Sequence, residues 1–156
     1  MTTKEDLQAT LRESLEGVLD LLNGLTPEQW AATTPTADHW TVRDTVSHLV
    51  TGEAGNLAIA RGVASGAEMY RPDFDLARYN RRNIEKNAEQ SPEELIDTLR
   101  SVREETLSFL DSLDDATLER SGRRTTGEET TVAGVFERIA DHQHEHAGEI
   151  RAAIGR

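Results

Sequence analysis

The stretch VAGVFERIADHQHEHAGEIRAAI, residues 132–154, decides the fold and indicates the chemistry. Its apolar residues recur at helical spacing along one stripe, namely Val132, Val135, Phe136, Ile139, Ile150, Ala153 and Ile154. His146 lies within that stripe and His142 on its flank, one turn away and roughly 40° apart in projection. Both imidazoles can therefore reach one ion. His144 projects roughly 150° from His146, and we expect it to face water.

A third ligand has to come from another part of the chain, where the remaining histidines are His39 and His48. His39 precedes a helix start at Thr41 and is expected on a loop, whereas His48 lies inside that helix and is the better candidate. Three histidines from two helices can hold a divalent metal and leave coordination positions open for a substrate. The alternative is that these histidines are hydrogen-bonded core residues without a metal.

Helical periodicity extends over nearly the whole chain. It predicts a first helix that ends near residues 23–24, and further helices over residues 41–63, 73–87, from 91 to about 113, and 132–154. Thr26, Thr41 and Ser91 begin helices in capping-box style. Residues 114–119 are expected to form a short turn, and residues 33–38 and 121–130 to form loops. Because no run alternates like a strand, the sequence predicts an all-α bundle of four principal helices in a single domain, residues 1–156.

The predicted helix over residues 73–87 has an unusual face, formed by Leu76, Asn80, Asn83, Ile84 and Asn87. Buried asparagines need hydrogen-bond partners, so one of two equally weighted interpretations is a polar pocket in which Asn80 and Asn83 meet the substrate. Arg78 or Arg82 could then meet carboxylates of that substrate. The alternative is a peripheral helix whose polar side chains are simply solvated.

Composition excludes several classes of function. The 29 acidic residues outnumber the 17 basic ones among 156, and the net charge of -12 opposes binding to nucleic acid or to anionic membranes. The absence of cysteine excludes disulfides and a protein thiol nucleophile, so sulfur chemistry would need an external thiol. The amino terminus does not resemble a signal peptide and no stretch is long enough for a membrane span, which predicts a cytoplasmic protein. The expected partner is a small-molecule substrate.

Two motifs resemble a known family. Residues 39–49, HWTVRDTVSHL, followed by Glu53, resemble the second-helix signature of the DinB-like superfamily, and especially its mycothiol-dependent maleylpyruvate isomerase amino-terminal branch. Residues 142–150, HQHEHAGEI, resemble the family's final HxxxH and its Gly-Gln-Ile-like tail. The resemblance covers nearly the whole chain. It implies an up-down-down-up four-helix bundle in which His48, His142 and His146 bind a zinc or nickel-like ion.

The resemblance also implies an activity. Characterised members use low-molecular-weight thiols such as mycothiol or bacillithiol, so we expect a metal-dependent thiol transferase or isomerase, with zinc favoured over nickel. The alternatives are a metal-dependent hydrolase and a non-enzymatic, stress-related metal-binding bundle. A divalent cation held by neutral histidines would acidify a water or thiol, which suits a chain without cysteine. Family members often pair, and a homodimer is the expected assembly.

Two carboxylates are candidate catalytic groups. His48 projects well away from the apolar stripe of its own helix, whereas Glu53 projects into that stripe. Either the helix is rotated so that the side bearing His48 also faces the bundle, which we favour, or Glu53 is a carboxylate that supports the site. Glu149 lies one turn beyond His146, and either carboxylate could move a proton. Gly52 and Gly55 would leave room for a ligand near His48.

Overall fold

The structure, a computed structural model, describes residues 2–36 and 38–156. Position 1, and position 37 within the predicted loop of residues 33–38, lie outside this description. The described chain is dominated by four long helices, which are α1 (Lys4–Leu22), α3 (Val42–Ala64), α5 (Pro92–Asp111) and α7 (Val132–Ile154). The shorter helices are α2 (Pro27–Trp30), α4 (Leu76–Lys86) and α6 (Asp115–Leu118). The predicted four-helix architecture is confirmed.

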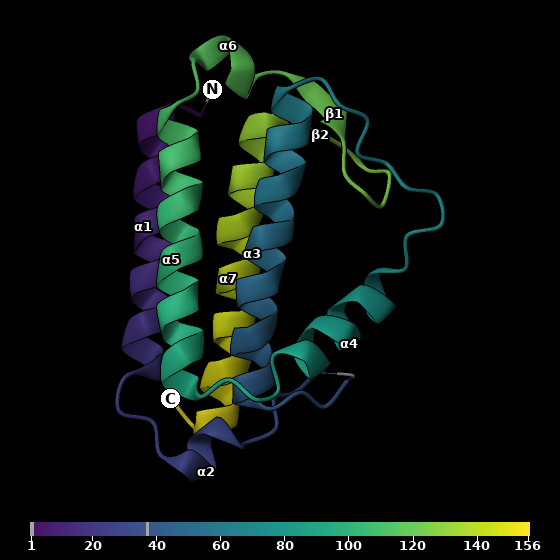
Figure 1. Ribbon diagram of the computed structural model, residues 1–156. Helices are drawn as coiled ribbons and strands as arrows, with labels where there is room; N and C mark the ends of the chain where they lie inside the picture. Colours follow the sequence, from purple (N-terminus) through teal and green to yellow (C-terminus); the bar gives the residue numbers. More distant parts are fainter. Residues whose placement is uncertain (1, 37) are drawn as a thin grey trace.

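The long helices form a ring in which α1 and α3 each pack against both α5 and α7. Figure 1 shows that α1 and α7 run toward one end of the bundle, and α3 and α5 toward the other. This is the up-down-down-up order. Because α3 and α5 are parallel, the chain between them must return along the length of the bundle, as crossover connections in such bundles do. Helix α4 lies within this return segment, residues 65–91.

Local sequence sets the helix starts. Thr3, Thr26 and Thr41 each accept a hydrogen bond from the backbone N–H three residues later, and the side chain at that later position accepts one from the cap's own N–H. Ser91 caps α5 by accepting a hydrogen bond from the backbone N–H of Glu94, and proline occupies the first turn. The starts predicted from the capping residues Thr26, Thr41 and Ser91 are therefore correct.

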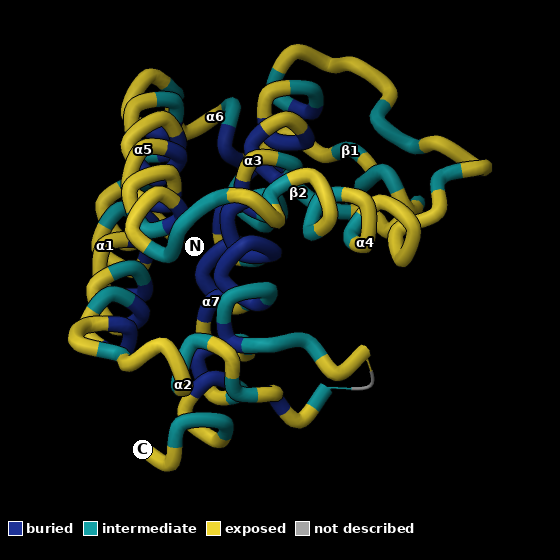
Figure 2. Tube along the Cα trace, turned by 60° about the horizontal axis from the view of Figure 1, so that its bottom comes forward, coloured by how far each residue is buried: buried dark blue, intermediate teal, exposed yellow. Residues whose placement is uncertain are grey.

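The core consists of two apolar layers separated by a polar one. Leu11, Leu110 and Phe136 belong to one apolar layer, and Val18, Leu99 and Ile150 to the other. Five of the buried polar residues lie between these layers along the four long helices, and they are Ser14, Glu53, Arg103, Thr106 and Gln143. In Figure 2 the buried segments gather where the long helices meet, while the outer sides of α1 and α5 are exposed. Every long helix therefore contributes a polar side chain to the middle of the bundle.

One expectation about the chain before α7 is wrong. Residues 121–130 were expected to be a loop without strands, but β1 (Ser121–Arg123) pairs antiparallel with β2 (Glu129–Thr131). Strands of three residues are too short to give an alternating pattern. The turn forms because Gly127 takes a φ of 102°, and its N–H donates to the carbonyl oxygen of Arg124 at 2.9 Å.

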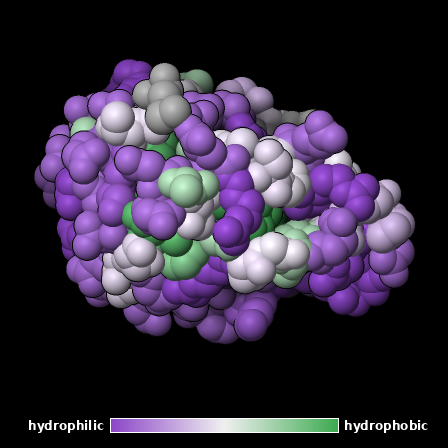
Figure 3. Space-filling view, turned by 90° about the horizontal axis from the view of Figure 1, so that it is seen from above, coloured by the Kyte–Doolittle hydropathy of each residue, from purple (hydrophilic) through white to green (hydrophobic). Residues whose placement is uncertain are grey.

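Helix α4 is peripheral. It contacts α3, and none of its residues, all of which the structure describes, is buried. Asn80, Asn83 and Asn87 are half-buried, whereas Leu76 is 50% exposed. The surface seen from above is mostly hydrophilic, with apolar atoms confined to its middle (Figure 3). Within the described residues, no helix combines the length and the apolar character that crossing a membrane requires.

Candidate metal centre and its pocket

Three histidine side chains meet between α3 and α7. His48 comes from α3, and His142 and His146 come from successive turns of α7. The Nε2 atom of His142 lies 2.8 Å from Nε2 of His48 and 3.1 Å from Nε2 of His146. The three candidate ligand atoms all lie within 4.8 Å of one another. His144 is exposed and His39 lies on a loop, as expected. The structure therefore brings together the three histidines that the sequence pointed to.

The position of His48 on its helix follows from how α3 is enclosed. His48 faces α7 and is 6% exposed, and Glu53, which is 2% exposed, faces α5. Because α3 packs against α4, α5 and α7, several of its sides are buried at once. The apolar stripe of α3 therefore marks only one of its buried faces. His48 and Glu53 are both buried because they lie on different faces of this helix, each covered by a different neighbour.

The environment of the site keeps the imidazoles of His48 and His142 neutral. The pKa of His48 is lowered from 6.5 to about 4, chiefly by burial and to a smaller extent by repulsion from His146 and Arg138. Burial also lowers the pKa of His142 from 6.5 to about 2, with repulsion from the neighbouring histidines, Arg138 and Arg124 as smaller causes. Metal ions bind imidazole in its neutral form. The protein thus holds these side chains in the protonation state that a metal requires.

Contacts around the histidines also fit a metal centre. The Nδ1 atom of His146 lies 2.5 Å from Oε2 of Glu149, so a proton on Nδ1 can be donated to that carboxylate. The lone pair of Nε2 then points toward the other two histidines. Metal-binding histidines commonly have this arrangement, in which a carboxylate accepts the proton of one ring nitrogen and the other nitrogen binds the metal. Nδ1 of His48 is buried without a hydrogen-bond partner among the described residues. The donor set therefore suits one divalent cation, with Glu149 orienting a ligand.

Glu53, the other candidate carboxylate, lies in the polar layer of the core. Its two oxygens accept hydrogen bonds from Arg103, at 2.6 Å from Nε and 3.2 Å from Nη2, and Thr106 donates a third at 3.0 Å. Arg103 also donates to the carbonyl oxygen of Leu11 on α1. Sequence reasoning missed Arg103, although it lies four residues after Leu99 within the apolar stripe of its helix. An arginine there predicts a buried acidic partner.

A cavity of about 540 Å³ opens beside the histidines. Its walls come from α3, from α4 and the segment before it, from the β1–β2 turn, and from α7. Besides the histidines, the residues that line it include Gly52, Gly55, Asn56, Phe74, Tyr79, Asn80, Arg124 and Arg138. Asn80 therefore lies where the sequence predicted. Asn83 borders a different cavity, together with Arg78 and Arg82.

Gly52 and Gly55, two of the glycines of α3, make room for protein side chains. A Cβ atom on Gly52 would lie 3.0 Å from Cε1 of His142, and one on Gly55 would lie 3.3 Å from the hydroxyl of Tyr79. An imidazole and a phenol thus take up part of the space beside these glycines, and both glycines also line the cavity that opens near His48. Gly52 is accordingly part of the histidine site, because any larger residue at this position would displace the imidazole of His142.

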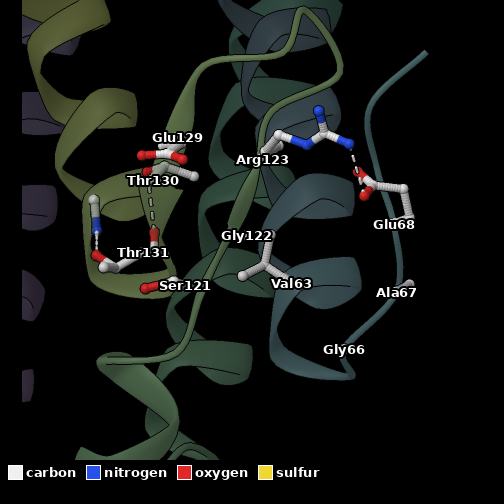
Figure 4. Close-up of a pocket in the computed structure, with 11 residues that line it drawn as sticks. Val63, Gly66, Ala67, Glu68, Ser121, Gly122, Arg123, Glu129, Thr130 and Thr131 are labelled. Atoms are coloured by element: carbon white, nitrogen blue, oxygen red, sulfur yellow. Dashed lines mark hydrogen bonds and ion pairs between the residues drawn. The ribbon is translucent and has the colours of Figure 1, made fainter.

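A larger cavity, of about 930 Å³, lies beside the hairpin (Figure 4). The side chains labelled there are engaged in holding local structure. Arg123 pairs with Glu68 at 2.9 Å, and Thr131 caps α7 by accepting from the N–H of Gly134 at 3.0 Å. Val63 packs against Gly122. The smaller cavity, which contains the three histidines, is therefore the candidate functional site.

Known structures with this fold cover almost the whole chain. YfiT from Bacillus subtilis, described as a probable metal-dependent hydrolase with an unusual four-helix bundle topology, has a TM-score of 0.78 and 19% identity, covering 97% of this chain and 87% of that one. The mycothiol-dependent maleylpyruvate isomerase has a TM-score of 0.79 and 10% identity, covering 95% of this chain but 60% of the isomerase. At these identities the similarity demonstrates the fold.

A third structure with this fold is the colibactin self-resistance protein ClbS, solved in complex with a double-stranded DNA. It has a TM-score of 0.78 and 16% identity, covering 98% of this chain and 96% of that one. No curated protein matches the chain. The family model of the DinB superfamily matches residues 4–150. The chain belongs to the DinB superfamily.

Proposed function

We propose that this chain is a metal-dependent enzyme in which His48, His142 and His146 hold one divalent cation at the wall of a small-molecule pocket. The observation that carries the proposal is the convergence of three imidazole nitrogens beside a cavity of about 540 Å³. Structural zinc sites are usually closed by four protein ligands, whereas catalytic ones keep a position open. A set of three histidines thus favours catalysis over a purely structural metal.

Within this proposal the reaction is thiol-dependent, a transfer or an isomerisation. When bound, the cation would act as a Lewis acid that promotes ionisation of the nucleophile. Zinc is the proposed ion and nickel the alternative, because a borderline-soft ion accepts both imidazole and the sulfur of a thiol, unlike magnesium or calcium. The chain has no cysteine, so the thiol would come from a small cosubstrate. The fold shared with a mycothiol-dependent isomerase supports this choice.

The chain's own residues have separate proposed roles. Glu149 holds a proton against Nδ1 of His146 and so fixes the direction of Nε2. Asn80 offers an amide to the substrate from the α4 side of the pocket. Tyr79 and Phe74 line the same wall and exclude water from it. Glu53 is committed to Arg103, and its proposed contribution is to position α3 relative to α5 rather than to move protons.

A metal-dependent hydrolase without any thiol is the second candidate function, and the description of YfiT favours it. Metal analysis of protein purified without a histidine tag tests what both candidates share. Alanine at any of the three histidines should greatly lower metal content, and His144→Ala should leave it unchanged. Equal loss with His144→Ala would refute the site. Turnover that requires metal and an added thiol supports the transferase, and metal-dependent turnover without thiol supports the hydrolase.

We also propose that the protein forms a homodimer, on the ground that closed symmetric pairs are the commonest assemblies. Static light scattering tests this directly, since the chain mass is 17.3 kDa. A mass that stays at one chain across a wide range of concentrations would refute the dimer.

A further inference from the structure

Arg124 is held inside the histidine pocket by the turn of the hairpin. Its backbone N–H donates to the carbonyl oxygen of Glu128 at 2.8 Å, and its own carbonyl oxygen accepts from Gly127 at 2.9 Å. The side chain is half-buried and lines the pocket together with the three histidines. The tight turn thus places the cationic side chain of Arg124 against the cavity that His48 also lines, although the two residues are 70 or more positions apart in the sequence.

The guanidinium of Arg124 has a neutral partner. Nη2 of Arg124 donates to Oδ1 of Asn56, whose Nδ2 donates to the carbonyl oxygen of Gly52 at 2.9 Å. These two bonds fix the amide, which is 8% exposed, and thereby orient the guanidinium. A guanidinium carries five N–H donors. In the described part of the chain Arg124 makes no other side-chain hydrogen bond and no salt bridge, so its remaining donors are available to a ligand.

A second arginine reaches the cavity from α7. Arg138 lies one turn before His142 and also lines the pocket. It pairs with Glu145 at 2.9 Å, and the two side chains are 42% and 56% exposed. Glu128, the other acidic residue at the cavity, is exposed and accepts a hydrogen bond from Thr126. The two acidic residues therefore lie at the solvent side of the pocket, and Arg124 is its half-buried cation without an acidic hydrogen-bond partner.

We infer that Arg124 binds the anionic group, a carboxylate or a phosphate, of the small molecule that occupies the pocket, with Arg138 as a secondary contact. Guanidinium groups form paired hydrogen bonds with both kinds of oxyanion. The same pocket is the substrate site of the proposed function, and the inference rests on it to that extent. Arg78 and Arg82, the arginines that the sequence offered for this role beside the alternative of a solvated face, border a separate cavity.

Titration calorimetry with succinate and, separately, with inorganic phosphate tests this inference. Both the metal-free and the metal-loaded protein are titrated, in a buffer free of carboxylate and phosphate and at constant chloride. Succinamide, the neutral analogue of succinate, serves as the ligand control. We expect the wild-type protein to bind at least one anion and not succinamide. Arg124→Gln should weaken that binding at least about tenfold, because charged hydrogen bonds are lost.

Arg82→Gln is the matched control, since it removes the same charge outside this pocket and should leave the affinity unchanged. Arg124→Lys, which keeps the charge but not the paired donors, should give an intermediate affinity. Unchanged thermal unfolding and metal content of Arg124→Gln show that the variant remains folded. Equal anion affinity in wild type and Arg124→Gln, or no anion binding by wild type, would overturn the inference. Arg124-dependent anion binding in a protein that takes up no metal would support it, even though the proposed function would then fail.

Discussion

At the scale of single residues, the middle of the bundle depends on polar groups that satisfy one another. Glu53 on α3, Arg103 and Thr106 on α5, and Ser14 on α1 are joined by hydrogen bonds, and Ser14 donates to Oε1 of Gln143 on α7 at 2.8 Å. Gln143 directly follows His142 in the sequence. The network thus connects all four long helices at the level of the metal centre.

Removing one partner of the buried ion pair tests this network. In Arg103→Met the carboxylate of Glu53 loses its counter-charge while it stays buried, and the free energy of unfolding should fall by about 3–5 kcal/mol. Urea denaturation monitored by circular dichroism measures this. The double variant Glu53→Gln/Arg103→Met should recover much of the loss. If Glu53→Gln lowered turnover without lowering stability, Glu53 would have a catalytic role after all.

Gly52 tests how tightly the histidine site is packed. A Cβ atom at this position would lie 3.0 Å from Cε1 of His142, so Gly52→Ala should displace the imidazole and weaken metal affinity about 10- to 100-fold. Competition with a chromogenic chelator measures the affinity. Gly148→Ala is the matched control, because a Cβ atom there meets nothing within 4 Å. Gly148→Ala should keep wild-type affinity and gain up to about 1 kcal/mol of stability.

The lowered pKa values of His48 and His142 make the metal-free protein sensitive to acid. The unfolded chain binds protons at these residues near pH 6.5, whereas the folded chain binds them only near pH 4 and pH 2. Because the unfolded state then holds more protons, stability falls as the pH drops below about 6.5, by roughly 1–2 kcal/mol per histidine at pH 5. Denaturation of the metal-free protein at pH 7 and pH 5 measures this loss.

The His142→Gln variant provides the comparison for this pH effect. It lacks one of the two titrating groups, so its stability should fall less between pH 7 and pH 5 than that of the wild-type protein. Histidine ring signals in the NMR spectrum of the metal-free protein should show His48 and His142 still neutral at pH 5. Titration of both near pH 6.5 would contradict the burial that the structure gives them.

At the scale of elements, the pocket is assembled by parts that do not belong to the four-helix core. Helix α4 and the β1–β2 hairpin both lie in connections between long helices, and each contributes one wall. The crossover between the parallel helices α3 and α5 carries Tyr79 and Asn80 to the histidines. The hairpin carries Arg124. The long helices therefore position the candidate metal ligands, and the connections supply the other walls of the pocket.

The hairpin turn can be perturbed separately from the metal ligands. Gly127 has a φ of 102°, and a Cβ atom there would lie 3.1 Å from Cε1 of Tyr70, so Gly127→Ala should shift the turn that holds Arg124. Gly24→Ala, at a φ of 73° with open space around it, carries similar backbone strain of about 1–2 kcal/mol far from the pocket. Both variants should lose stability in thermal unfolding. A weaker affinity for anions is expected only for Gly127→Ala, and equal affinities would contradict the role of the turn.

At the scale of the whole molecule, charge decides which partners are favoured. The net charge of -12 should prevent binding to a duplex, although ClbS, which shares this fold, was solved with double-stranded DNA. We expect no change in fluorescence anisotropy of a labelled duplex at micromolar protein in 50 mM salt. A synthetic polycationic peptide serves as the positive control for the label. Salt-sensitive binding of the duplex would contradict the prediction and place this chain's surface chemistry closer to that of ClbS.

The sequence by itself determined the features that depend on neighbours along the chain. Capping residues such as Thr41 and Ser91 give helix starts because their side chains bond the backbone three residues away. His142 and His146 share a face because residues four apart on a helix are adjacent. The exposure of His144 follows from the same geometry. The motifs around His48 and His142 led to the family for this reason, since both are local patterns.

Only the tertiary structure decided which distant side chains meet. The partner of Glu53 is Arg103, fifty residues later, and the side chain that approaches Gly52 is that of His142. Arg124 enters the pocket because two strands of three residues pair by backbone hydrogen bonds, which leave no periodic trace in the sequence. An apolar stripe marks one side of a helix that faces the core, and it does not show how many other sides are covered by neighbouring helices. Helix α3 is enclosed by three others, so the faces that carry His48 and Glu53 became evident only once the bundle was assembled.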